Sequence, residues 1–217
     1  QGVYEFKNDV PYEITLNKEN VAFVGYGDVW FIGKGKGLAT NNIMFYSNTP
    51  SNCIAIQNIK IKDFNYAILY NGPGSFKIKF LKQIHFIDNA TAVATYTPEG
   101  SQINQANITF CVFINNNTNL YISQSVYSGD CHYTKVHNNT FFNGGFYTAF
   151  QRGDKALCEF TNNIFFNSPI TPYNLSDWSN NNFFNSGTPR GNNYFIYNPL
   201  FNDTNPLNPI LTLRRES

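Results

Sequence analysis

Proton transfer is the chemistry for which this sequence gathers the most suitable side chains. Two Gly-Asp pairs, ending at Asp130 and Asp154, have histidine, lysine and arginine close by in the sequence. A carboxylate beside basic side chains can accept or donate a proton when the fold brings these groups together. The candidate catalytic residues are Asp130, His132, Lys135, Arg152 and Lys155. The alternative interpretation, which the thin spread of acidic residues favours, is a pair of Gly-Asp turns with solvated basic neighbours.

Metal and cofactor sites are not expected. Cys131 and His137 come nearest to the close Cys/His pairing of a zinc site, and they are the only such pair. Asp63 and Asp88 fit turn positions better than calcium ligands, since no Asp-x-Asp pair accompanies them. The glycine-rich stretch 33–37 lacks the strand and helix that flank a phosphate-binding loop, so it predicts a tight turn.

Composition excludes several classes of protein. The chain has 217 residues, of which 42% are hydrophobic and 13% are charged, and it contains 21 Phe and 14 Tyr. Such a chain can bury a sizeable core and is not disordered. A net charge of +1 argues against nucleic acid as a partner. No uncharged apolar run reaches about 18 residues, so no membrane span is expected.

The sequence favours strands over helices. Ile59–Lys62 and residues 76–80 alternate apolar residues with lysines, as half-buried strands do. Strong helix formers are scarce, and asparagine, glycine and aromatic residues interrupt every helical pattern. The 34 asparagines are far more than ordinary usage. We therefore predict an all-β fold.

An apolar residue, any residue and then Asn or Asp recur through most of the chain. The polar members are Asp63, Asp88, Asn115, Asn143, Asn167, Asn185 and Asn202, at intervals of 25, 27, 28, 24, 18 and 17 residues. Repeats of this length indicate a solenoid. With strand character and unequal loops, the fitting solenoid is a single-stranded parallel β-helix of about seven to eight coils. Asparagine suits its corners because it tolerates the left-handed backbone conformation and its amide can bond along the stack, while the aromatic residue two positions earlier points inward.

The chain resembles the right-handed parallel β-helix (pectate-lyase-like) superfamily. The residues that carry the resemblance are the Asn-Asn-x-Phe-Phe-Asn coils and the segment Asn198–Asp203. The resemblance implies a right-handed coil, with residues 1–40 as an opening coil and cap, 41–205 as the repeats and 206–217 as an exit segment. Enzymes that cleave or epimerise acidic polysaccharides dominate this superfamily, so the resemblance also implies that a site for such chemistry could be present. Such lyases use Ca²⁺ or basic residues to neutralise the sugar carboxylate, and no compact calcium cluster is visible.

Secretion and glycosylation are expected. The sequence begins with Gln1 rather than Met, and it has an even number of cysteines. Six sequons occur, at Asn89, Asn107, Asn116, Asn138, Asn174 and Asn202. Together these features favour an extracellular or cell-surface protein.

The cysteines allow three disulfide connectivities. Cys131 and Cys158 follow corner residues by 16 and 15 positions, so they occupy nearly the same phase of consecutive coils. Stacking would bring such a pair within disulfide range. A Cys53–Cys111 bond would then follow only by elimination.

We expect a non-enzymatic structural or adhesive protein of the cell surface or extracellular matrix. The open ends of a β-helix must be capped or paired, and an uncapped end would let copies stack into a filament. The expected partners are therefore further copies of the chain and extracellular glycans. A lyase or epimerase acting on an acidic glycan, or a carbohydrate-binding protein without activity, are the alternatives.

Overall fold

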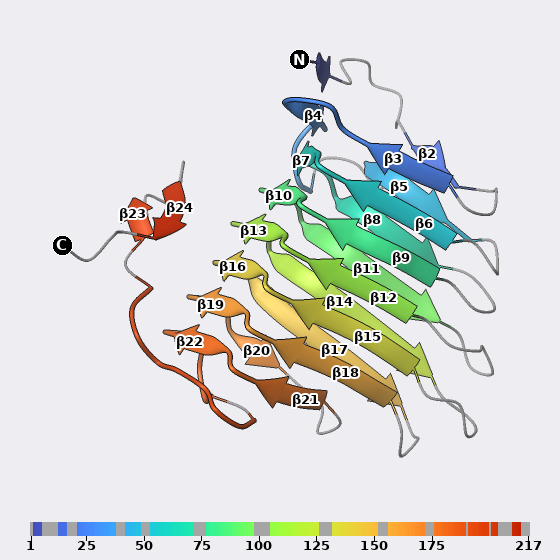
Figure 1. Ribbon diagram of the computed structural model, residues 1–217. Coiled ribbons are helices and arrows are strands. Elements are labelled where there is room, and N and C mark those ends of the chain that lie inside the picture. The colour runs from blue at the N-terminus through green and yellow to red at the C-terminus, as the bar shows by residue number, and fades with distance from the viewer. Residues whose placement is uncertain are drawn as a thin grey trace.

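The chain folds into a parallel β-solenoid with three sheets along its length (Figure 1). The computed structural model describes residues 2–5, 13–16, 21–37, 42–48, 53–71, 77–97, 105–125, 132–151, 156–171, 176–189, 191–199, 201–203 and 210–213. Every regular element in these ranges is a strand. No helix long and apolar enough to cross a membrane occurs among them. The predicted all-β parallel solenoid is confirmed.

Three parallel sheets form the walls. Sheet A contains β1 (Gly2–Glu5), β4 (Val29–Ile32), β7 (Lys60–Lys62), β10 (His85–Ile87), β13 (Val112–Ile114), β16 (Thr140–Phe142), β19 (Ile164–Phe166) and β22 (Asn182–Phe184). Sheet B contains β2 (Ile14–Thr15), β5 (Ile43–Ser47), β8 (Tyr66–Asn71), β11 (Thr91–Thr97), β14 (Thr118–Ser125), β17 (Gly145–Gln151) and β20 (Ile170–Thr171). Sheet C contains β3 (Val21–Val24), β6 (Cys53–Gln57), β9 (Lys77–Lys82), β12 (Gln105–Thr109), β15 (His132–His137), β18 (Ala156–Thr161) and β21 (Ser176–Ser179). The chain visits sheets C, A and B in turn.

Aromatic rings stack through the core along sheet A. Phe86, Phe113, Phe141, Phe165 and Phe183 are buried, and the ring centroids of successive members lie 4.9, 4.6, 4.8 and 5.2 Å apart. Register explains the stack, because strand pairing places each of these residues directly opposite the next. The predicted inward position of the aromatic residue two places before the corner is confirmed.

Left-handed residues form the corner between sheets A and B. Asp63, Asp88, Asn115, Asn143, Asn167 and Asn185 have positive φ angles between 48° and 62°. Asparagine and aspartate are favoured there because other side chains tolerate this backbone conformation less well. Six of the seven predicted positions therefore share one corner. The prediction was wrong for Asn202, which lies in β23, outside the three stacked sheets.

The two ends of the chain join the solenoid in different ways. Strands β1 to β4 pair within the stacked sheets, and the predicted domain boundaries stay a prediction. Near the C-terminus, β23 (Phe201–Asp203) and β24 (Ile210–Leu213) form a separate antiparallel pair. Phe201 is buried against Phe142 and Phe166 on the outer face of sheet A. Phe201 thus covers part of an apolar strip on the solenoid wall.

Candidate functional site

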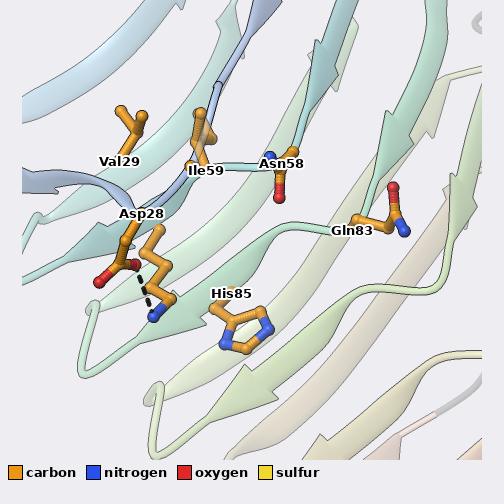
Figure 2. Close-up of a pocket in the computed structure, with 8 residues that line it drawn as sticks. Asp28, Val29, Asn58, Ile59, Gln83 and His85 are labelled. Atoms are coloured by element: carbon orange, nitrogen blue, oxygen red, sulfur yellow. Dashed lines mark ion pairs between the residues drawn. The ribbon is translucent and has the colours of Figure 1, made fainter. Parts of the chain in front are cut away.

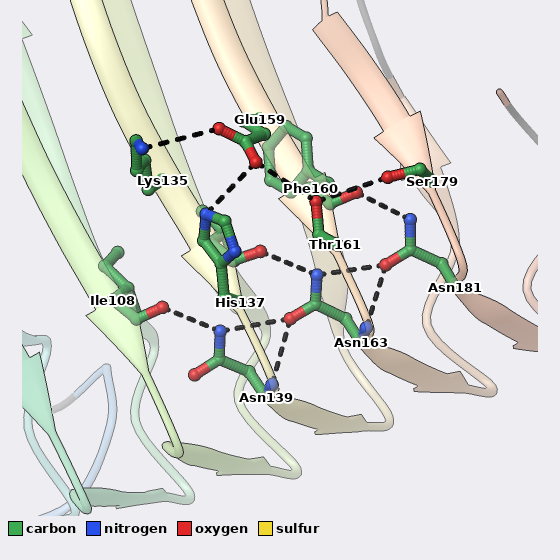
Figure 3. A network of polar contacts seen from close by, with 11 residues as sticks. Ile108, Lys135, His137, Asn139, Glu159, Phe160, Thr161, Asn163, Ser179 and Asn181 are labelled. Carbon is green, nitrogen blue, oxygen red and sulfur yellow. Dashed lines mark hydrogen bonds and ion pairs between the residues drawn. The ribbon is translucent and has the colours of Figure 1, made fainter. Parts of the chain in front are cut away.

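A ladder of buried asparagines lies at the corner between sheets C and A (Figure 3). The backbone N–H and the side-chain amide of Asn139 both donate to Oδ1 of Asn163, at 2.9 and 3.1 Å. Asn163 donates in the same way to Oδ1 of Asn181, at 2.9 and 3.0 Å. The second amide hydrogen of each asparagine goes to a carbonyl of the preceding coil, on Ile108, Val136 or Phe160. The ladder thus satisfies buried polar groups that would otherwise destabilise the core.

The sequence contained a signal for this ladder that the repeat motif missed. Each rung follows an exposed left-handed residue: Asn138 before Asn139, Asn162 before Asn163 and Asn180 before Asn181. Asn-Asn doublets therefore mark a coil corner in which the first residue turns the chain and the second points inward. The corner between sheets A and B follows the same rule, with Asn89 and Asn116 buried one position after Asp88 and Asn115.

The outer face of sheet C carries the charged cluster beside the ladder (Figure 3). Nζ of Lys135 lies 3.8 Å from Oε2 of Glu159, its register partner on β18. Nε2 of His137 lies 3.7 Å from Oε1 of Glu159 and has no hydrogen-bond partner. The hydroxyl of Thr161 contacts both Glu159 and Ser179, each at 3.4 Å. Glu159 is therefore the shared centre of this cluster.

Burial sets the protonation of His137. Desolvation lowers its pKa, and Lys135 lowers it further, while Glu159 acts in the opposite direction. The imidazole is consequently neutral at pH 7, since its ordinary pKa already lies below that value. A neutral imidazole next to a carboxylate can accept a proton, so the cluster has the groups for acid–base chemistry. Its lysine, however, is engaged with Glu159.

Of the predicted catalytic residues, the structure places Lys135 in this cluster. Asp130, Arg152 and Lys155 lie outside the described residues, and of His132 only the backbone position at the start of β15 is described. Sequence reasoning missed Glu159 as the partner of Lys135, because counting from the corners did not give the register of the strands between them. That the five predicted catalytic residues lie together in one site therefore stays a prediction.

A hollow of about 40 Å³ lies between the first coils (Figure 2). Its lining includes Asp28, Asn58, Lys60, Gln83 and His85. Nζ of Lys60 lies 2.8 Å from Oδ1 of Asp28 and 4.6 Å from the centre of the Trp30 ring. Burial and the Lys60 charge lower the pKa of His85, against the effect of Asp28. This volume suits only a few water molecules, so the hollow is too small for a sugar-sized substrate.

Comparisons with known proteins add no family. Neither protein-family models nor curated proteins nor solved structures gave a match to this chain. Within the described residues, no three His, Cys, Asp or Glu side chains are grouped as a metal site would require. A proposal on function therefore rests on the fold and on the described side chains.

Cys111 corrects the predicted disulfide to Cys53. It is a free, buried thiol, and its Sγ lies 3.4 Å from the carbonyl oxygen of Leu81. Its backbone N–H donates to Oδ1 of Asn139 at 2.9 Å. Cys111 thus occupies the next rung of the asparagine ladder, where its S–H donates to a carbonyl of the preceding coil as the amides do. The sequence prediction paired Cys53 with Cys111 only because these two cysteines remained, so it could not detect this structural role.

Only one member of the predicted Cys131–Cys158 disulfide, Cys158 on β18, lies among the described residues. Register pairs Cys158 with Thr134, three positions beyond Cys131. Loop lengths differ between coils, so positions counted from one corner do not give the register of the next strand. Cys131 lies outside the described residues, so the bond itself stays a prediction.

Cys111 should resist thiol reagents in the folded protein. Burial raises its pKa to about 12, so the reactive thiolate is scarce at pH 7. We expect iodoacetamide to leave Cys111 unmodified under native conditions and to modify it fully in urea, as measured by peptide mass mapping. Rapid native labelling, or a mapped Cys53–Cys111 disulfide, would contradict the structure.

Two predicted glycosylation sites are also corrected. Asn89 is 0% exposed and Asn116 is 1% exposed. The Asn89 side-chain amide donates to the carbonyl of Ile61 and to Oδ1 of Asn116, and the Asn116 amide donates to the carbonyl of Phe86. Neither nitrogen can carry a glycan in the folded chain. Asn107 and Asn138 are exposed, whereas Asn174 and the Asn202 side chain lie outside the described residues.

Proposed function

We propose that this chain is a secreted, glycosylated structural or adhesive β-helix protein of the cell surface or extracellular matrix, which assembles end to end. We further propose that the coil is right-handed and of the pectate-lyase-like type. The carrying observation is an exposed apolar strip, Tyr194–Tyr197, at the last coil of the stack. Within it, Ile196 is 60% exposed and Tyr197 is 72% exposed.

The strip continues the solenoid only partly. The Phe195 carbonyl accepts a bond from the backbone N–H of Phe183, and the Phe195 N–H donates to the carbonyl of Asn181, both at 2.8 Å. Asn182 thus lies between Ile164 of β19 and Phe195. Open strand edges and exposed apolar side chains both favour pairing with another chain. A contact of this end with the opposite end of a second copy would propagate as a filament.

Self-assembly gives the most direct test of this proposal. We expect the full chain to form filaments that lengthen with concentration in negative-stain electron microscopy. The double substitution Ile196→Asp and Tyr197→Asp should leave the far-UV circular dichroism unchanged and give single particles. Phe110→Ser is the matched control, because Phe110 is exposed at a corner in the middle of the stack. A parent protein that stays monomeric at every concentration would refute end-to-end assembly.

Glycosylation tests the secreted state separately. In a eukaryotic secretory host, we expect glycans on Asn107 and Asn138 of the secreted protein, mapped by glycopeptide mass spectrometry. Asn89 and Asn116 should be unmodified, because a glycan there would replace buried hydrogen bonds and prevent folding. Secreted, folded protein with a glycan on Asn89 would contradict this prediction.

The alternative of a polysaccharide lyase or epimerase would place its base in the cluster on sheet C. The specific observation in its favour is the neutral His137 beside Glu159. Ultraviolet absorbance of unsaturated uronate products, followed on a panel of acidic glycans, tests it. Activity that is lost in His137→Gln would establish a lyase, and no absorbance change would exclude one for those glycans.

A further inference from the structure

Sheet B differs from the other two walls in charge. Its seven strands contain no Asp, Glu, Lys, Arg or His. The charged strand residues lie on the other walls, as with Lys60, Lys62 and His85 on sheet A and Lys135 and Glu159 on sheet C. The strands of sheet B themselves therefore offer a ligand no ion pair.

Tyrosines cover the outer face of sheet B. Register places Tyr46, Leu69, Ala94 and Tyr121 in one row across β5, β8, β11 and β14. Ala94 points away from the core, yet it is 0% exposed, because the surrounding tyrosines pack against it. The four tyrosines of this cluster, here called the tyrosine platform, are Tyr46, Tyr66, Tyr96 and Tyr121.

The tyrosine platform is preorganised and partly open to solvent. The rings of Tyr96 and Tyr121 have centroids 4.8 Å apart. Burial, together with a hydrogen bond to Tyr66, raises the pKa of Tyr96 well above its ordinary value. All four tyrosines keep part of their surface exposed. Held in this way, the rings lose little conformational entropy when a ligand binds.

We infer that the tyrosine platform binds an uncharged polysaccharide. The C–H faces of a pyranose ring suit tyrosine rings, which join an apolar surface to a polar hydroxyl. Hydroxyl and amide groups border the rings: Asn71 is the exposed register partner of Tyr96, and Thr91 and Thr118 align with Tyr66. Strands without cations do not favour nucleic acid or an anionic glycan as the ligand.

The exposed sequons of the described residues lie away from sheet B. Asn107 lies in β12 of sheet C, and Asn138 directly follows β15 at the corner between sheets C and A, so neither of these two sequons lies on sheet B. The inference gives the ligand class of the adhesive function proposed above, and it rests on that function. Filament formation uses a different surface, residues 194–197, so either property can fail without the other.

Binding to defined polysaccharides tests the inference. We expect the full chain to be retarded in affinity gel electrophoresis by at least one of three neutral probes: soluble β-glucan, mannan or xyloglucan. Tyr121→Ala should weaken that binding by about tenfold or more, as truncation of an aromatic anchor does. Tyr121→Phe should keep most of it. Tyr26→Ala is the matched control, because Tyr26 is the most exposed aromatic residue described and lies between β3 and β4.

Footprinting of the unmodified protein avoids any loss of fold in a variant. Hydroxyl-radical oxidation of the platform peptides should fall when the bound probe is present, while oxidation of Tyr26 should not change. Absence of binding to all three neutral probes would overturn the inference. So would stronger binding to polygalacturonate, or a change in oligomeric state caused by Tyr121→Ala, which would assign the platform to another copy of the chain.

Discussion

Asn163→Ala is expected to lower the free energy of unfolding by about 3 kcal/mol or more. The substitution removes the acceptor of the Asn139 N–H and amide groups and the donor to the Val136 carbonyl. Each buried polar group left without a partner costs about 1–3 kcal/mol. Urea unfolding followed by circular dichroism measures the change.

The neighbouring residue supplies the control. Asn162 is exposed and left-handed, with a φ of 57°, so Asn162→Gly keeps the corner and removes no buried bond. We expect its stability to stay within about 0.5 kcal/mol of the parent. Equal effects of the two substitutions would show that the buried ladder does not stabilise the fold.

Phe165→Ala is expected to cost about 3–5 kcal/mol, the usual loss for deleting a buried aromatic side chain. The Phe165 ring stacks between Phe141 and Phe183, at 4.8 and 5.2 Å, and also lies 5.8 Å from Trp178. Removing it would leave a cavity in the middle of the core. The urea midpoint of the variant, compared with the parent, measures the loss.

Phe110→Ala is the matched control, because Phe110 is 54% exposed at a corner. Its stability should change by no more than about 0.5 kcal/mol. Phe165→Leu should fall between the two, since it keeps much of the buried apolar volume. A Phe165→Ala protein as stable as the control would contradict the continuous ring stack.

The repeat could be predicted because stacking makes one position of every coil alike. Phe-x-Asn in 113–115, 141–143 and 165–167 gave the inward ring and the left-handed corner together. Asn202 matches the same pattern but lies in β23, because a three-residue motif carries no information on which sheet its strand joins.

The inner face was harder to predict than the corners. Asn89 and Asn116 match a glycosylation sequon, yet their side chains point inward and bond across coils. Whether an asparagine amide is buried depends on the hydrogen-bond partners in the neighbouring coils, and a sequon does not encode those partners. Cys111 likewise occupies a rung that asparagine fills in later coils.

The candidate sites were only partly predictable for a related reason. Lys135 was expected beside acidic residues of loops, whereas its partner is Glu159 on the adjacent strand. The tyrosine platform gave no sequence signal, because its four members come from four coils and become neighbours only through register. Because loop lengths vary between coils, counting sequence positions does not reveal which residues share such a row.

Disulfide trapping tests the register, on which the whole account rests. Asn107 on β12, Lys135 on β15 and Glu159 on β18 form one row on the outside of sheet C. Adjacent strands lie about 4.8 Å apart, within the Cα range of a disulfide, whereas next-but-one strands are too distant. We predict rapid oxidation of the Asn107→Cys, Lys135→Cys pair and none between cysteines replacing Asn107 and Glu159. A bond in the second pair and none in the first would contradict the parallel stack.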